Sequence, residues 1–251
     1  MKKTILFAAL CAMFISCNAT DVNDEPEVKA NWSSSAQYGN WSNGGYTVYN
    51  NIWGAGAGSQ SIWANNYSQW GVWANHPNSD GIKSYPNSTR YIGKTLSTIN
   101  TLSTSFNATT PAGGAWVSSY DIWDSAKAHE IMLWMNYTSN ANGSGNIKPI
   151  SYNYSSTGAI PVYTNQSIGG HTWNVFRGHN GGNNVYSFLR TSKTNSGTID
   201  AKAILNWIKN KGWFGDINVG DVQFGFEITS SYGTNGNGLN YMCNSYSVTS
   251  N

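Results

Sequence analysis

Two glutamates stand out among the residues that could carry out acid–base chemistry. Beyond residue 30 the chain has six aspartates but only two glutamates, Glu130 and Glu227. Each lies within a run of apolar and aromatic residues, where an unpaired carboxylate is costly. A single glutamate is more often an exposed residue in a simple ion pair. Two in matching contexts favour a pair of carboxylic acids that divide the work of proton donor and nucleophile or base, as glycosidic bond cleavage requires.

Strand-like alternation predicts that both glutamates share one face of a sheet, because successive side chains in a strand point to opposite sides. The expected cleft face carries Glu130, Met132, Trp134 and Asn136 in one segment and Gln223, Gly225, Glu227 and Thr229 in the other. The apolar residues between them form the expected core face. We expect Gly225 to leave room beside Glu227 for a bound polymer. His129, on the opposite face from Glu130, is expected to be structural.

Other kinds of catalytic site lack their sequence signals. No serine lies in a Gly-x-Ser-x-Gly turn, and no glycine-rich loop opens a helix to hold phosphate. The four histidines show no metal-ligand spacing. We therefore expect neither a metal nor a cofactor.

The elements that must position these residues are short and closely spaced strands, separated by turn signals such as Asn142-Gly143 and Asn235-Gly236. The candidate strands are Tyr46–Trp53, Ser61–Asn66, Gly71–Asn75, Ala115–Trp123, Glu130–Tyr137, His171–Gly178, Val185–Thr191, Asp221–Thr229 and Leu239–Val248. Many strands without alternating helices predict an all-β fold, a jelly-roll β-sandwich of two curved antiparallel sheets.

One helix is predicted over Ile199–Lys211. Thr198 or Asp200 can cap its start, and Gly212 can end it. The face expected to be buried carries Ala203, Ile204, Trp207 and Ile208. We expect this helix to pack on the outside of the sandwich. The pattern indicates one domain, 31–251, with no repeat or linker.

Composition describes a polar but uncharged surface. Aromatic residues make up 14% of the chain and charged residues 10%, against roughly 25% charged in typical soluble domains. Such a surface suits a neutral, hydroxyl-rich partner such as a sugar. Without Lys2 and Lys3, two of the 14 basic residues, 12 basic residues balance 12 acidic ones. This balance gives no sign of a nucleic-acid partner.

The first thirty residues are expected to lie outside the fold. A basic start and an apolar stretch, too short to span a bilayer, indicate a signal peptide over 1–16. The Phe14-Ile15-Ser16-Cys17 run resembles a bacterial lipobox, which would make Cys17 the lipidated residue; ordinary cleavage near Ala19 is the alternative. The acidic segment 17–30 reads as a tether. We therefore expect an exported bacterial lipoprotein at the outer membrane or cell surface, and a monomer. Within the domain Cys243 is alone, so no internal disulfide is expected.

Several motifs across 31–251 resemble glycoside hydrolase family 12, the jelly-roll endoglucanases and xyloglucanases. They are Asn50-Asn51-Ile52-Trp53-Gly54, Lys83-Ser84-Tyr85-Pro86, Ser119-Tyr120-Asp121-Ile122-Trp123, Glu130-Ile131-Met132-Leu133-Trp134, Val185-Tyr186-Ser187-Phe188 and Gln223-Phe224-Gly225-Phe226-Glu227. The resemblance implies a retaining endo-acting hydrolase of β-1,4-glucans, namely cellulose, mixed-linkage β-glucan or xyloglucan.

The resemblance also implies roles for individual residues. Glu130 matches the family's nucleophile, Glu227 its acid/base and Asp121 the residue that supports the nucleophile. Trp53 would stack on a sugar, with Asn51 beside it, and the remaining candidates for the cleft are Met132, Trp134, Trp73 and Trp116. We expect the pKa of Glu227 to be raised by the nearby Glu130 and by aromatic surroundings.

Two features depart from the family pattern, and two alternatives remain open. The N-terminal disulfide of many members is missing, and Asp121 and Glu130 are only nine positions apart, so the rim of the cleft is expected to be trimmed. One alternative is a non-catalytic surface lipoprotein that binds glycans. The other is a xylanase of the related family 11, against which the Asn-Asn-x-Trp-Gly and Glu-Ile-Met motifs speak. The sequence leaves the preferred β-glucan and the side of the membrane open.

Overall fold

The computed structural model describes residues 30–139 and 147–251. The predicted signal peptide, the lipid site at Cys17 and nearly all of the predicted tether therefore lie outside the described residues. Within those two ranges no helix has the length and apolar character that crossing a membrane requires.

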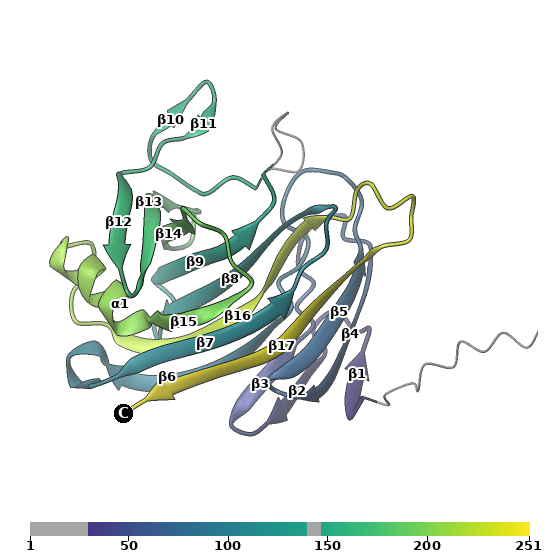
Figure 1. The fold of residues 1–251 in the computed structure, drawn as a ribbon, viewed down its shortest axis with the longest axis horizontal. Coiled ribbons are helices and arrows are strands. Elements are labelled where there is room, and N and C mark those ends of the chain that lie inside the picture. Colours follow the sequence, from purple (N-terminus) through teal and green to yellow (C-terminus); the bar gives the residue numbers. More distant parts are fainter. Residues whose placement is uncertain (1–29, 140–146) are drawn as a thin grey trace, which may run out of the picture.

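Two large sheets stack face to face, which confirms the predicted jelly-roll sandwich (Figure 1). In spatial order the nine-stranded sheet holds β12 (Tyr163–Ile168), β13 (His171–His179), β14 (Asn184–Arg190), β9 (His129–Tyr137), β8 (Ala115–Asp124), β16 (Asn218–Ser230), β6 (Asn87–Thr95), β3 (Tyr46–Tyr49) and β2 (Asn40–Asn43). The six-stranded sheet holds β1 (Trp32–Ser34), β4 (Ser59–Asn66), β5 (Gln69–Asn75), β17 (Leu239–Ser250), β7 (Leu102–Thr109) and β15 (Ser196–Asp200). A small hairpin of β10 (Tyr154–Ser155) and β11 (Gly158–Ala159) stands apart from both.

Every predicted strand is present, but the pairing is not wholly antiparallel. β9 and β14 run parallel, and the other pairs in the large sheets are antiparallel. The predicted strand Tyr46–Trp53 was too long, because β3 ends at Tyr49. Asn51 has a left-handed φ of 45°, a conformation that interrupts a strand. The chain turns there instead of continuing the sheet.

The main core lies between the sheets and follows the predicted alternation. Ile131, Leu133 and Met135 of β9 belong to it, as do Phe224 and Phe226 of β16. A second apolar cluster lies on the other side of the nine-stranded sheet. It contains Val117, Met132, Trp134, Phe176, Val185 and Leu189. The nine-stranded sheet is therefore covered by side chains on both faces over part of its area.

Helix α1 (Ala201–Asn210) directly follows β15 in the chain. A short 3-10 turn, η1 (Leu96–Thr98), connects β6 to β7. Asp200 caps α1 by accepting a hydrogen bond from the amide of Ala203 at 2.9 Å. One expectation for this helix was wrong: Leu205, and not Ala203, lies on the buried face. Trp207 packs against the core as expected, although it is only partly buried. Because its buried residues join the main core, the helix closes one end of the sandwich against β7 and β12 (Figure 1).

Candidate active site

Three carboxylates come from three adjacent strands and line one cavity of about 740 Å³. Asp121 lies on β8, which runs between β9 with Glu130 and β16 with Glu227. The cavity is lined by Asn51, Trp53, Ile82, Tyr85, Asp121, Trp123, Lys127, Glu130, Met132, Trp134, Lys148, Ile150, Asn180, Asn183, Gln223 and Glu227. The sequence prediction that the two glutamates share one groove is thus met by the geometry.

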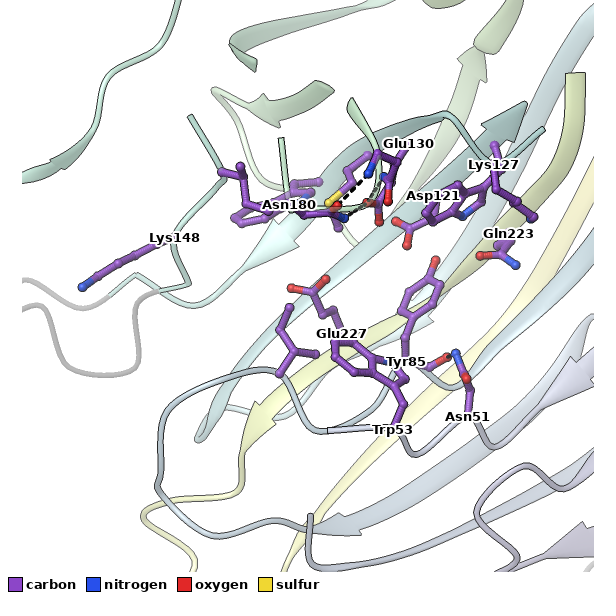
Figure 2. Close-up of a pocket in the computed structure, with 16 residues that line it drawn as sticks. Asn51, Trp53, Tyr85, Asp121, Lys127, Glu130, Lys148, Asn180, Gln223 and Glu227 are labelled. Atoms are coloured by element: carbon purple, nitrogen blue, oxygen red, sulfur yellow. Dashed lines mark hydrogen bonds between the residues drawn. The ribbon is translucent and has the colours of Figure 1, made fainter. Parts of the chain in front are cut away.

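The two glutamates approach the cavity from different positions along β8. Glu130 is in register with Trp123, and Glu227 with Val117, six positions away on the same strand. Figure 2 shows their side chains on opposite sides of the cavity with both carboxyl groups turned into it, and the carboxyl group of Asp121 beside that of Glu130. The convergence depends on the curvature of the sheet, because a flat sheet would leave side chains at such separated registers apart.

Glu130 is held by amide donors from the loop between β13 and β14. The Nδ2 atoms of Asn180 and Asn183 donate to its Oε2 at 3.3 and 3.1 Å. Burial raises the pKa of Glu130, whereas the hydrogen bond from Asn183 and the charge of Lys127 act to lower it. Lys127 reaches the cavity from the short β8–β9 turn and forms an ion pair with Asp221.

Glu227 has a different environment. Its side chain is buried, and burial, followed by repulsion from Glu130, raises its pKa to about 8. The expected rise is present, with burial as the larger cause. A carboxylic acid with such a pKa still carries its proton at neutral pH and can donate it.

Asp121 is also buried, and burial together with the charges of Glu130 and Glu227 raises its pKa well above the usual range. The hydroxyl of Ser119 donates a hydrogen bond to it at 3.4 Å. Three acids this close together in one cleft are not readily all ionised, because like charges repel. Glu130, which has amide donors and a nearby cation, is the acid best placed to hold the negative charge.

Trp53 and Asn51 occupy the cavity wall as expected. The indole of Trp53 is 48% exposed, and backbone amides of Trp53 and Gly54 both donate to the carbonyl of Lys83. Asn51 donates from Nδ2 to the carbonyl of Tyr85 at 3.1 Å. A side chain at Gly54 would collide with the carbonyl of Ile82, so a glycine is required for this close approach. The arrangement presents a free aromatic face to the cavity.

Met132 and Trp134 also line the cavity, but two other predicted tryptophans do not. Trp116 lies in the main core, where its ring packs edge-on against Tyr241, because its position on β8 alternates to the core face. Trp73 lies on β5 of the six-stranded sheet and points away from the core. Both assignments to the cleft were wrong: Trp116 lies on a strand of the cleft sheet but on its core face, and Trp73 lies on a strand of the other sheet, which alternation alone does not reveal.

The expectation for Gly225 was also wrong. A Cβ atom there would lie 2.2 Å from the carbonyl oxygen of Pro86 and 2.7 Å from the Cβ of Asn87. The space beside Gly225 is therefore filled by the neighbouring strand β6 and its approach. The glycine permits close packing of two backbones and leaves no room for a polymer.

Several cavity residues were not singled out from the sequence. Trp123 shares its face with Asp121 and could have been found by the same period of two, and Gln223 was placed on the cleft face without a role. Asn180 and Asn183 lie in a segment that carried only a turn signal. Their contact with Glu130 depends on the parallel pairing of β14 with β9, which local sequence does not reveal.

A second cavity of about 540 Å³ shares Glu227, Ile82 and Lys148 with the first. Gln223 of β16 lines the first cavity, while Thr229 and Ser230 of the same strand line the second. The open space thus extends to both sides of Glu227. Among the described residues, no cluster of three or more His, Cys, Asp or Glu side chains could hold a metal ion.

Comparisons with known proteins agree with this geometry. A family model described as glycosyl hydrolase family 12 matches residues 44–251. The chain is 31% identical to a probable xyloglucan-specific endo-β-1,4-glucanase A of Aspergillus terreus, over 76% of this chain and 78% of that protein. It is 29% identical to endoglucanase S of Pectobacterium parmentieri, over 74% and 76%.

Solved structures give the same result. The xyloglucanase domain of NopAA, a type three effector from Sinorhizobium fredii in complex with cellobiose, superposes with a TM-score of 0.83 and 57% identity, covering 88% of this chain and all of that one. A native family 12 xyloglucanase from Bacillus licheniformis gives a TM-score of 0.71 and 27% identity, with 88% and 100% covered.

Proposed function

The chain belongs to glycosyl hydrolase family 12, and from this premise we propose that its preferred substrate is xyloglucan and that Glu130 and Glu227 carry the reaction. It is a retaining endo-β-1,4-glucan hydrolase. Membership of family 12 excludes the family 11 alternative.

Glu130 is the nucleophile of the proposed double displacement. Its carboxylate attacks the anomeric carbon while Glu227 gives its proton to the departing glycosidic oxygen. In the second step Glu227 removes a proton from water. The oxygen of this water attacks the anomeric carbon and breaks its bond to Glu130, which releases the sugar. The observation that carries this assignment is the contrast in pKa causes. Burial raises the pKa of both glutamates, but the hydrogen bond from Asn183 and the charge of Lys127 oppose this rise at Glu130, whereas the charge of Glu130 adds to it at Glu227.

Asp121, on the strand between those of Glu130 and Glu227, is the positioning residue. Burial and the neighbouring carboxylates raise its pKa well above the usual range, which favours the neutral form and limits the negative charge in the cleft. A neutral carboxylic acid is a hydrogen-bond donor. Directed at Glu130, as Figure 2 shows its carboxyl group to be, it favours one orientation of the nucleophile.

Xyloglucan is supported as the substrate by the relatives and by the shape of the site. The structure with 57% identity is described as a xyloglucanase domain, and the Aspergillus terreus relative as probably xyloglucan-specific. The two cavities that meet at Glu227 leave space on both sides of the cleavage point. An internal segment of a branched polymer needs such an open groove. Trp53 offers the aromatic face on which a sugar unit of the backbone would stack.

The test compares reducing ends released from xyloglucan and from carboxymethylcellulose under equal conditions. We expect a higher kcat/KM on xyloglucan, because the groove admits substituted chains. The Glu130→Gln protein serves as the control for contaminating activity. Equal or faster release from carboxymethylcellulose would refute the substrate preference while leaving the family and the chemistry untouched.

We also propose export, lipidation at Cys17 and a monomeric domain over 31–251. The support is the sequence alone: a basic start, an apolar stretch, a lipobox-like Phe14-Ile15-Ser16-Cys17 and the acidic segment that follows. Expression in a bacterial host with labelled palmitate tests the anchor. Label in the membrane fraction that is lost in Cys17→Ala is expected. A secreted, unlabelled protein cleaved near Ala19 would refute lipidation.

A further inference from the structure

Two tryptophans project from the outer face of the six-stranded sheet, on the side away from the core. Along β5 the buried residues Trp70, Val72 and Ala74 alternate with Gly71 and Trp73, so Trp73 points outward. Along the neighbouring β4, Ile62 and Ala64 are buried, and Trp63 points outward between them. Both indoles are partly exposed. The nine-stranded sheet, with the cleft, lies on the other side of the main core.

Each of these indoles lies across a glycine. A Cβ on Gly71 would lie 2.6 to 2.9 Å from three ring atoms of Trp63. A Cβ on Gly238 would lie 2.5 to 2.8 Å from three ring atoms of Trp73. The Nε1 of Trp73 also donates to the carbonyl of Asn237 at 3.0 Å. Each ring is thus held against the backbone, and each tryptophan stays partly exposed.

The surrounding surface is polar and uncharged. On β4, β5, β17 and β7 the outward-facing residues are serine, threonine, asparagine or glutamine, apart from Trp63, Gly71, Trp73 and Met242. None of the outward side chains in these four described strands is charged. Exposed sheet faces are usually rich in charged residues. This face therefore offers hydroxyls, amides and aromatic rings without an electrostatic preference.

Register places the two rings along one line of the sheet. Trp63 is paired with Gly71, and Trp73 lies two positions further along β5. Such diagonal neighbours have Cα atoms roughly 7–8 Å apart. Because the rings lie over different glycines, one extended ligand would contact them with successive units. A small ligand would reach one ring only.

We propose that this outer face is a second binding site for a β-1,4-glucan chain, separate from the catalytic cleft. Trp63 and Trp73 form the platform, and the adjacent serine, threonine and asparagine side chains supply hydrogen bonds. The occupant is a neutral polysaccharide because the face is itself uncharged, and an extended one because the rings are spread along the sheet. The inference rests on the proposed function for the nature of the ligand. The site holds the polymer near the enzyme while the cleft acts on another stretch of chain.

The test uses the full-length protein with Glu130→Gln, so that the polymer is not consumed. Native gel electrophoresis through gels containing soluble xyloglucan measures the dissociation constant from the retardation. Trp63→Ala with Trp73→Ala should weaken polymer binding at least about fivefold, since exposed aromatic anchors dominate such contacts. Thr249→Ala, on the same face but distant from both rings, is the matched control and should bind like the parent. Trp63→Phe with Trp73→Phe should restore part of the affinity.

Folding and the proposed function are checked separately. In the active background the two alanine changes should leave kcat/KM on a short cello-oligosaccharide unchanged, because both rings lie outside the cleft. If the double alanine protein does not fold, Trp73→Gln alone, which can still donate to Asn237, gives the measurement. Unchanged retardation of the tryptophan variants, or a change in oligomeric state without a change in retardation, would overturn the proposal. Failure of the wild type to release reducing ends would refute the proposed function instead.

Discussion

Replacing Glu227 by glutamine should stabilise the fold at high pH and destabilise it at low pH. Burial and the nearby Glu130 raise the pKa of Glu227 from 4.5 to about 8. A carboxyl group with a higher pKa in the folded chain keeps its proton there after the unfolded chain has lost its own. The unfolded state is therefore favoured progressively between pH 4.5 and about 8, and the full penalty persists above that range.

The size of the effect follows from the same values. The difference between 4.5 and about 8 corresponds to about 5 kcal/mol of unfolding free energy, at roughly 1.4 kcal/mol for each pH unit. This figure is the ceiling for Glu227→Gln. Burying an amide in place of the acid costs about 1–3 kcal/mol. A net gain of about 2–4 kcal/mol is thus expected at pH 9, and a loss of about 1–3 kcal/mol at pH 4, where only the cost of the amide remains.

Urea unfolding of both proteins between pH 4 and pH 9 measures the difference. Asp216→Asn is the control of opposite sign, because hydrogen bonds from Lys209 and Ser97 lower the pKa of Asp216. Its stabilising effect is present above the usual aspartate range, so the variant should be slightly less stable by a constant amount from pH 5 to pH 9. A stability difference for Glu227→Gln that is the same at pH 5 and pH 9 would refute the reasoning.

Other predictions concern turnover and the core. Glu130→Gln should abolish release of reducing ends while retaining glucan binding, and substantial residual turnover would contradict its role. In the wild type, kcat/KM should fall as the pH rises through about 8, where Glu227 loses its proton; a profile flat to pH 10 would contradict this. Asn183→Ala removes a donor that lowers the pKa of Glu130, so the acidic limb of the profile should move to higher pH. Trp116→Ala should lower the free energy of unfolding by about 3–5 kcal/mol and leave KM unchanged, since Trp116 is a core residue. A raised KM with normal stability would show that Trp116 contacts the substrate.

The alternation of side chains predicted which face of each catalytic strand meets the cleft. This worked for β9 and β16 because apolar residues at every second position leave one register consistent with a core. It could not place Trp73, which alternates equally well, because sheet membership depends on pairing between distant segments. β6 and β7 were not predicted from the sequence either. β6 has little apolar periodicity of its own, and β7 is held between β17 and β15.

Local backbone features limited the prediction of the sugar-binding loop. The segment from Tyr46 to Trp53 reads as one continuous strand, yet the left-handed Asn51 interrupts it. That interruption lets Trp53 leave the sheet and reach the cavity, anchored by the carbonyl of Lys83. The family resemblance identified the residues, but only the fold explains the turn. The early end of the strand at Tyr49, four residues before Trp53, is thus the feature that makes the aromatic platform available.

The different chemistry proposed for the two glutamates comes from their neighbours and not from the strands that carry them. Both lie on the cleft face of one sheet, on strands that flank β8, and burial raises the pKa of each. What differs is the set of groups on the Glu130 side: two asparagine amides from the β13–β14 loop and Lys127 from the β8–β9 turn. The short β8–β9 turn therefore supplies the cation. If the roles depend on this asymmetry, moving the donors must change the pH profile without moving either glutamate, which is why Asn183→Ala is the more discriminating test than removing a carboxylate.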